Sequence, residues 1–208
     1  MEDSKRILLK RISQYTVPEL CDGMEVFEAM DCQIKPWIGR KKIIGFALTV
    51  NVPAGEGGIV ADAIEMVKEG DVIVIAGKGN LKSSYWGDHR SYCARMMKAE
   101  GVVVDGAFRD LEGCEEVGFP VYAKGLTCGT AGKSGVGQIN VPVSCGGIII
   151  RPGDIIAGDM NGVCVIRPEE AGDILERTER KVAAQKKVVE EMERTGCVIT
   201  RIKWNKKG

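Results

Sequence analysis

Three charged residues of this chain stand where their side chains could act together on one ligand. Twenty residues separate Asp88 from the pair Arg109 and Asp110. The segment between them has the pattern of a helix followed by a buried strand, and another apolar strand precedes Asp88. In a strand, helix and strand unit, the helix N-terminus and the carboxyl ends of both strands face the same edge of the sheet, where ligands tend to bind. The spacing therefore predicts that two carboxylates and a guanidinium converge.

The chemistry that suits this combination is the binding of a hard divalent cation. Mg²⁺ and Mn²⁺ prefer oxygen ligands, and Mg²⁺ is often held through one or two carboxylates while it keeps several waters. Each residue also has an ordinary structural explanation, because an aspartate in a first helical turn favours the helix dipole and an Arg-Asp pair is commonly a surface ion pair. The predicted convergence of all three residues favours the metal site.

The elements that position these residues follow from the apolar pattern. We expect, in order, a strand over 71–76, a glycine-rich loop over 77–85, a helix over 86–99, a strand over 102–105 and a turn over 106–108. Asp88 would then lie in the first turn of the helix, and Arg109 would follow the second strand. The first part of the glycine-rich loop precedes the helix N-terminus, so it can help to wall the cleft.

The rest of the chain divides into an α/β frame and a glycine-rich β layer. The pattern predicts a helix over 17–30 with Pro18 in its first turn, a strand over 43–50, a helix over 58–69, short strands within 120–166 and a helix from about 168 to 195. The last helix has a stripe that suits packing on the sheet or on a neighbouring subunit. The stripe consists of Ile174, Leu175, Thr178, Val182, Gln185, Val189 and Met192. Without an internal repeat or linker, we predict one domain over residues 1–208.

Composition and charge indicate a soluble globular protein that binds neither nucleic acid nor membrane. The 208 residues include 29 Lys and Arg against 29 Asp and Glu, aromatic residues are 5% of the chain, and the basic clusters at 40–42 and 203–207 are short. The sequence has no apolar run of membrane-spanning length and no signal peptide. Its eight scattered cysteines form no CxxC pair, which suits reduced, mostly buried thiols in the cytoplasm.

Other catalytic or binding arrangements have less support in the sequence. Gly77-Lys78-Gly79 is followed by Lys82 where a dinucleotide fingerprint needs glycine, and Gly132-Lys133-Ser134 lacks the first glycine of a phosphate loop. His89 is the only histidine. On a helix it points about 100° away from Asp88, so a structural or solvent-facing role is favoured. A serine or cysteine nucleophile is not favoured, because the sequence has no second histidine to act as its base. Catalysis by a lysine that forms a Schiff base is an alternative that the sequence leaves open.

The chain resembles the class II 4-hydroxy-4-methyl-2-oxoglutarate aldolases and the regulator of ribonuclease E activity A, which form the RraA-like family. The resemblance covers about residues 16–195 and is most specific in the spacing of Asp88 from Arg109-Asp110. The segments that carry it are Trp86 to Asp88, Asp105 to Asp110, Gly118 to Tyr122, Gly137 to Val143, Cys145 to Gly147, Arg151 to Asp154 and Asn161 to Ile166, with Thr16 to Asp22 and Ile43 to Val50 upstream.

This resemblance implies a swivelling three-layer β/β/α fold that assembles as a homotrimer or a dimer of trimers. It also implies that Asp110 ligates Mg²⁺ or Mn²⁺ directly and that Asp88 holds the ion through a water. Arg109 would contact the pyruvyl part of a small 2-oxo acid substrate, and Asp88 and Arg109 would be the catalytic residues. The substrate carboxylate would also face the start of the helix, which is formed by Gly87, Asp88, His89 and Arg90.

The implied activity is cleavage of a carbon–carbon bond in a 2-oxo acid to give pyruvate. Retro-aldol cleavage of 4-hydroxy-4-methyl-2-oxoglutarate and decarboxylation of oxaloacetate both produce an enolate, whose charge the metal and Arg109 would stabilise. Aldolases of the family carry a glutamate just after a glycine near the C-terminus, reaching the neighbouring subunit's site, but here Gly196 is followed by Cys197. This departure favours the decarboxylation, which needs no deprotonation of a hydroxyl group.

The alternative hypothesis belongs to a different class: a non-catalytic regulator that binds a ribonuclease. The resemblance includes such proteins. The presence of Asp88, Arg109 and Asp110 favours the enzyme, because a pure binding protein has no need of a cleft prepared for a metal. Pyruvate release from oxaloacetate and 4-hydroxy-4-methyl-2-oxoglutarate, measured with Mg²⁺ or Mn²⁺ and with chelator, is the most informative test.

Overall fold

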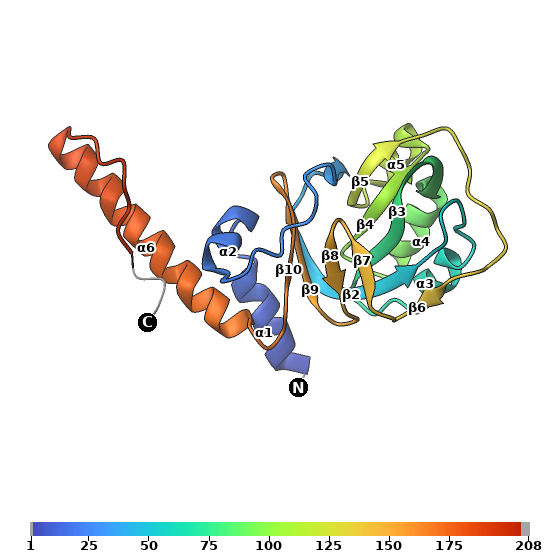
Figure 1. The fold of residues 1–208 in the computed structure, drawn as a ribbon, viewed down its shortest axis with the longest axis horizontal. Coiled ribbons are helices and arrows are strands. Elements are labelled where there is room, and N and C mark those ends of the chain that lie inside the picture. The colour runs from blue at the N-terminus through green and yellow to red at the C-terminus, as the bar shows by residue number, and fades with distance from the viewer. Residues whose placement is uncertain (1, 205–208) are drawn as a thin grey trace. The chain divides into compact units, whose positions relative to one another are not determined.

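The computed structural model describes residues 2–204, apart from the side chains of residues 2 and 3, and divides them into two compact units (Figure 1). The larger unit spans residues 28–167. The smaller unit combines residues up to Phe27 with those from Pro168 onward. The end of the predicted basic tail, with Lys206 and Lys207, lies outside the described residues.

One eight-stranded sheet forms the frame of the larger unit, in the order β1-β5-β4-β3-β2-β9-β10, with β6 paired to β2. Its central strands β2 to β5 run parallel, and the strands at either side pair antiparallel. The strands are β1 Lys35–Ile38, β2 Ile43–Asn51, β3 Val72–Trp86, β4 Gly101–Phe108, β5 Val121–Leu126, β6 Gln138–Ile139, β9 Ile155–Asp159 and β10 Gly162–Ile166.

The alternation of side chains along the buried strands produces three layers. On β3, Ile73 and Ile75 belong to the core beneath the helices, whereas Val72 and Val74 belong to the core beneath the second β layer. The helices are α3 Val60–Glu65, α4 Asp88–Met96 and α5 Leu111–Val117, and the β layer is a hairpin of β7 Val143–Cys145 and β8 Ile148–Ile150. The three helices lie together on one side of the sheet (Figure 1). This is the β/β/α arrangement that the family resemblance implied.

The glycine-rich segment before α4 is the main departure from the prediction. The expected loop over 77–85 and the expected turn over 106–108 are both parts of strands, because β3 and β4 continue to pair there with irregular register. A Cβ on Gly77 or on Gly106 would lie 2.7 Å from Cε2 of Tyr85. The buried Tyr85 hydroxyl also donates to the Gly77 carbonyl, at 3.1 Å. The glycines therefore accommodate an aromatic ring across the strands rather than form a loop.

In the smaller unit, three helices pack together: α1 Glu2–Ile12, α2 Val17–Gly23 and α6 Ala171–Thr195. The predicted helix over 17–30 is wrong in length, because Met24 is extended and Arg177 Nε donates to the Gly23 carbonyl, at 2.6 Å. At its other end the Thr16 capping box fixes the start of α2.

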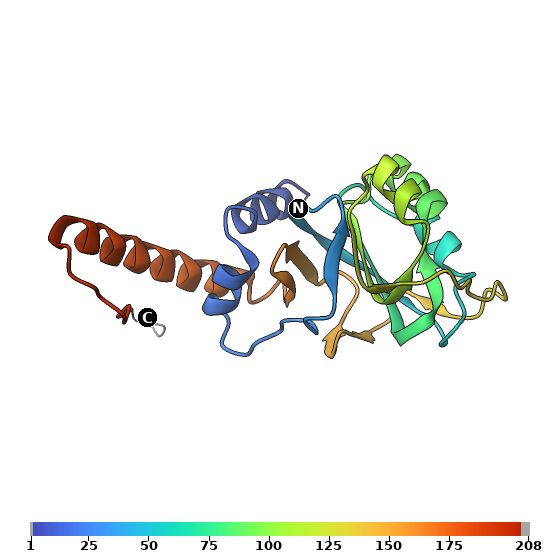
Figure 2. The ribbon, with the colours of Figure 1, turned by 90° about the horizontal axis from the view of Figure 1, so that it is seen from above.

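Helix α6 begins at Ala171, slightly later than predicted, and its apolar stripe is buried only in the first turns. Ile174 and Leu175 are buried, whereas Val189 is 41% exposed. The segment after Gly196 runs back alongside the helix (Figures 1 and 2), and the Trp204 ring centroid lies 6.0 Å from Lys181 Nζ.

Several smaller predictions also need correction. Helix α4 begins at Asp88 rather than 86, and α3 is shorter than the predicted range 58–69. Helices α1 and α5 and strand β1 were not predicted. All eight cysteines are free thiols, but they are not mostly buried, since Cys32, Cys128 and Cys197 are exposed. Among residues 2–204, no helix is long and apolar enough to cross a membrane.

Candidate active site

The first carboxylate of the site lies at the beginning of α4. Strand β3 ends at Trp86, Gly87 caps the helix in an extended conformation, and Asp88 is the first helical residue. The Asp88 Oδ1 atom accepts a hydrogen bond from the His89 backbone N–H, at 2.6 Å. The helix N-terminus therefore supports a negative charge at Asp88.

The other two residues follow β4 on a turn of unusual backbone conformation. Asp110 has φ 58° and ψ 52°, which is the left-handed region, and its carbonyl accepts the first hydrogen bond of α5 from the Cys114 N–H, at 2.8 Å. Arg109 Nε lies 3.0 Å from Asp110 Oδ2. The side chains of Arg109 and Asp110 are 44% and 37% exposed, so both can be reached by a ligand.

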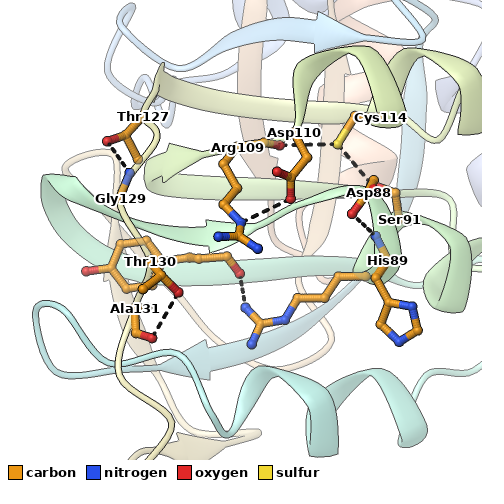
Figure 3. A network of polar contacts seen from close by, with 12 residues as sticks. Asp88, His89, Ser91, Arg109, Asp110, Cys114, Thr127, Gly129, Thr130 and Ala131 are labelled. Carbon is orange, nitrogen blue, oxygen red and sulfur yellow. Dashed lines mark hydrogen bonds and ion pairs between the residues drawn. The ribbon is translucent and has the colours of Figure 1, made fainter.

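The side chains of Asp88 and Asp110 (Figure 3) each lie against a glycine. A Cβ on Gly87 would lie 2.8 Å from Asp110 Oδ2, and a Cβ on Gly113 would lie 2.8 Å from both Cβ and Oδ2 of Asp88. Each aspartate thus packs against a glycine on the element that carries the other. The convergence predicted from the spacing is present, and it depends on the absence of two side chains.

This packing gives a testable prediction for Gly113, which lies within α5. In an exposed helix, replacing glycine with alanine stabilises the protein by about 0.5–1 kcal/mol. We expect Gly113→Ala to lower the free energy of unfolding instead, because the added methyl group would overlap the Asp88 carboxylate. Urea unfolding measures the effect.

The matched control for this prediction is Gly172→Ala in the first turn of α6. A Cβ at Gly172 would meet nothing within 4 Å. This variant should show the ordinary stabilisation. A Gly113→Ala protein that is stabilised as much as Gly172→Ala would contradict the close packing on Asp88.

The two residues after Asp88 differ in their surroundings. Arg90 is directed into the protein, where its guanidinium donates to the carbonyls of Tyr85 and Gly57, the latter at 2.7 Å. Burial, with a smaller contribution from the charge of Arg109, lowers the pKa of Arg90. His89 is exposed, and its Nε2 lies 3.7 Å from Cys93 Sγ. Its solvent-facing placement agrees with the prediction.

A further segment beside the site was not identified from the sequence. The Thr127 N–H donates to the Phe108 carbonyl, at 2.9 Å, and the Gly129 carbonyl accepts from the Ser84 N–H, at 3.3 Å. These bonds place residues 127–131 next to the turn that carries Arg109 (Figure 3). No feature of its sequence marks this segment as part of the site, because its position depends on contacts with β3 and β4.

The donor set fits a hard divalent cation. Asp88 and Asp110 offer carboxylate oxygens from two different elements, and Asp110 is partly exposed. Mg²⁺ and Mn²⁺ suit such a site because water supplies the remaining ligands. Within residues 2–204, no group of three or more His, Cys, Asp or Glu residues could hold a metal ion, so a fully protein-ligated site of the zinc type is not found there.

Comparisons with known proteins extend these observations. Residues 17–165 match a protein family described as RraA-like: Aldolase/RraA. A protein of Halalkalibacterium halodurans named "Putative 4-hydroxy-4-methyl-2-oxoglutarate aldolase" is 38% identical over 175 residues, which are 83% of each chain.

Solved structures show the same fold. The RNA-processing inhibitor RraA from Thermus thermophilus has a TM-score of 0.69 and 27% identity, over 74% of this chain and 93% of that one. An uncharacterized protein from Pseudomonas syringae has a TM-score of 0.78 and 23% identity, over 93% of this chain and 94% of that one. The second likeness concerns the fold alone.

Proposed function

This chain belongs to the RraA-like family, and from that premise we propose that it is a divalent-metal-dependent carbon–carbon lyase that acts on 2-oxo acids and releases pyruvate. The observation that carries the proposal is the mutual packing of Asp88 on Gly113 and of Asp110 on Gly87. Two carboxylates at the adjoining starts of α4 and α5, beside a guanidinium and a helix N-terminus, suit a cation and an anionic substrate together.

Each site residue has a distinct role in this proposal. Asp110 would hold Mg²⁺ or Mn²⁺ directly, and Asp88 would hold it through a water. When bound, the ion supplies a Lewis acid that stabilises negative charge on substrate oxygens. Arg109 would pair with the pyruvyl part of the substrate and stabilise the enolate that remains after bond cleavage.

The start of α4 would orient the substrate carboxylate. Backbone N–H groups at a helix N-terminus favour anions, and Gly87 caps this N-terminus. The Arg90 side chain is already engaged with two carbonyls of the protein, so only its backbone would serve the substrate.

Pyruvate release tests this function directly. Oxaloacetate and 4-hydroxy-4-methyl-2-oxoglutarate are each incubated with the purified protein and Mg²⁺ or Mn²⁺, and then with an excess of chelator. We expect turnover of at least one substrate with either metal and its loss with chelator. Turnover that persists after the metal has been removed, or no turnover of either substrate, would reject the proposal.

The residue after Gly196 leads to a prediction about the substrate. If a glutamate at this position deprotonates the 4-hydroxyl group in the aldolases, this protein should decarboxylate oxaloacetate faster than it cleaves the hydroxy acid. Cys197 is exposed in the single chain, so a carboxylate introduced there does not disturb the fold of the subunit. We expect Cys197→Glu to raise the aldol rate by about 10- to 10²-fold, within the usual range for a general base, and to leave decarboxylation unchanged.

The control for this prediction is Cys197→Gln, which has the shape of glutamate without its charge. Steady-state rates on both substrates are compared for the three proteins. A wild-type protein that already prefers the hydroxy acid would show that no base is missing. Equal aldol rates in the Glu and Gln variants would show that position 197 does not reach the reacting atoms.

We also propose assembly as a trimer or a pair of trimers, in which the C-terminal end of the chain meets a neighbouring subunit. Val189 and Val198 are 41% and 84% exposed in the single chain, which supports an apolar contact there. Sedimentation of the purified protein measures the assembly, and a monomer would reject it.

A second candidate function is the inhibition of a ribonuclease. It is supported by the likeness to the RNA-processing inhibitor from Thermus thermophilus, at 27% identity. Ribonuclease activity measured with and without the protein tests this candidate. The Asp110→Asn variant distinguishes the two functions, because inhibition by surface contact should survive the loss of the site's charge.

A further inference from the structure

A series of three linked hydrogen bonds, the first two of them buried, lies beside the candidate site. Trp86 Nε1 donates to Ser91 Oγ at 2.8 Å, Ser91 Oγ donates to Cys114 Sγ at 3.7 Å, and the Cys114 thiol donates to the Arg109 carbonyl at 3.5 Å. Trp86 is 2% exposed, and Ser91 and Cys114 are fully buried. Figure 3 shows the two hydrogen bonds that link Ser91 to Cys114 and Cys114 to Arg109. The series connects the end of β3 and the helix α4 with the turn that follows β4.

The direction of these bonds is fixed by the groups that make them. An indole N–H can only donate, so Ser91 accepts from Trp86 and has its own proton left for Cys114. The thiol in turn has one proton for the Arg109 carbonyl. Each of the three donors, Trp86, Ser91 and Cys114, therefore has one acceptor.

The final acceptor, the Arg109 carbonyl, lies next to a residue with an uncommon backbone conformation. The Arg109 carbonyl belongs to the peptide that leads into Asp110, whose left-handed conformation is uncommon for a residue other than glycine. The hydrogen bonds of α5 begin with the Asp110 carbonyl, so the Arg109 carbonyl lies outside the helix. The Cys114 thiol, one turn into the helix, reaches back to it.

We propose that Ser91 and Cys114 are positioning residues, which fix the Arg109-Asp110 turn and thereby orient the guanidinium and the carboxylate of the site. Their effect on catalysis rests on the proposed function, whereas their effect on the turn does not. Groups that hold the direct partners of a metal or substrate commonly change metal affinity or activity by about 10- to 10²-fold.

The test compares two buried cysteines whose thiols donate to different backbone carbonyls. Cys114→Ala removes the donor to the Arg109 carbonyl. Cys145→Ala removes an equally buried thiol that faces the Ile75 carbonyl, at 3.9 Å, in the core beneath the second β layer. Both variants should have a lower melting temperature than the wild type, because each substitution leaves a small cavity. Stability alone therefore does not distinguish a positioning role from ordinary packing.

The decisive measurement is amide hydrogen exchange of the peptide that contains residues 108–111. We expect faster exchange there in Cys114→Ala and unchanged exchange in Cys145→Ala. Ser91→Ala should act in the same direction, since it removes the donor to the thiol. Equal exchange of this peptide in Cys114→Ala and Cys145→Ala would overturn the proposal, whatever reaction the protein catalyses.

The catalytic part of the inference has its own readout. In the pyruvate-release assay, kcat of Cys114→Ala should be about 10-fold lower than that of Cys145→Ala, with a smaller change in KM. Cys114→Ser keeps a buried hydrogen-bond donor and should recover part of the loss. Equal kcat values for the two alanine variants would remove the catalytic role, while the exchange measurement would still report on the turn.

Discussion

Asp110→Asn is expected to lower metal-dependent pyruvate release by about 10³-fold or more, while the protein remains folded. A Lewis-acid metal contributes several kcal/mol to transition-state stabilisation, and about 1.4 kcal/mol corresponds to a tenfold change in rate. Asparagine is the appropriate replacement because Asp110 has φ 58°, and asparagine adopts the left-handed region more readily than alanine does. The variant therefore removes the charge without disturbing the turn.

Three measurements define this experiment: pyruvate release, Mn²⁺ affinity by calorimetry and the circular dichroism spectrum. The matched control is Asp173→Asn, at an exposed position in the first turn of α6. Asp88→Asn should weaken Mn²⁺ binding less, since its contact is expected through a water. Unchanged turnover in a folded Asp110→Asn protein would remove the proposed metal site.

Arg109→Lys is expected to lower kcat by about 10²-fold even though the positive charge is kept. A guanidinium presents a planar fork of donors to a carboxylate and an enolate oxygen, whereas an ammonium group is a compact point charge. Loss of one preorganised donor to a developing oxyanion typically costs 10²- to 10³-fold. In the structure Arg109 pairs with Asp110 through Nε, so its terminal nitrogens are the atoms that a substrate would meet.

The control for this variant is Arg95→Lys on α4. Arg95 donates to the Val117 carbonyl, at 2.9 Å, and is exposed. The same chemical change is thus made on the same layer of helices without altering the site. Near-wild-type kcat for Arg109→Lys would show that Arg109 acts only as a diffuse positive charge.

The parts of the fold that could be predicted from the sequence are those set by local pattern. The apolar run that became β3 and the helical spacing after Asp88 depend on neighbouring residues alone, so the order of strand, helix and strand was predicted correctly. The short helices α3 and α5 were predicted too long or missed, because their limits depend on packing more than on periodicity.

The local sequence pattern could not predict the structural role of the glycines. Gly77 and Gly106 suggested a loop and a turn, but both lie in strands where the Tyr85 ring occupies the space of a side chain. Gly87 and Gly113 likewise make space for Asp110 and Asp88. Such requirements arise between residues distant in sequence, so local pattern does not reveal them.

The sequence by itself determined that Asp88 lies in the first turn of a helix and that Arg109 and Asp110 follow a strand, since hydrophobic periodicity reveals the order of these elements. Only the tertiary structure decided how closely the carboxylates approach and what holds them. The glycine beside each aspartate, the left-handed turn at Asp110 and the Cys114 thiol behind Arg109 are brought together by the packing of α4 against α5. That packing depends on side-chain volume across the fold, which sequence spacing does not specify.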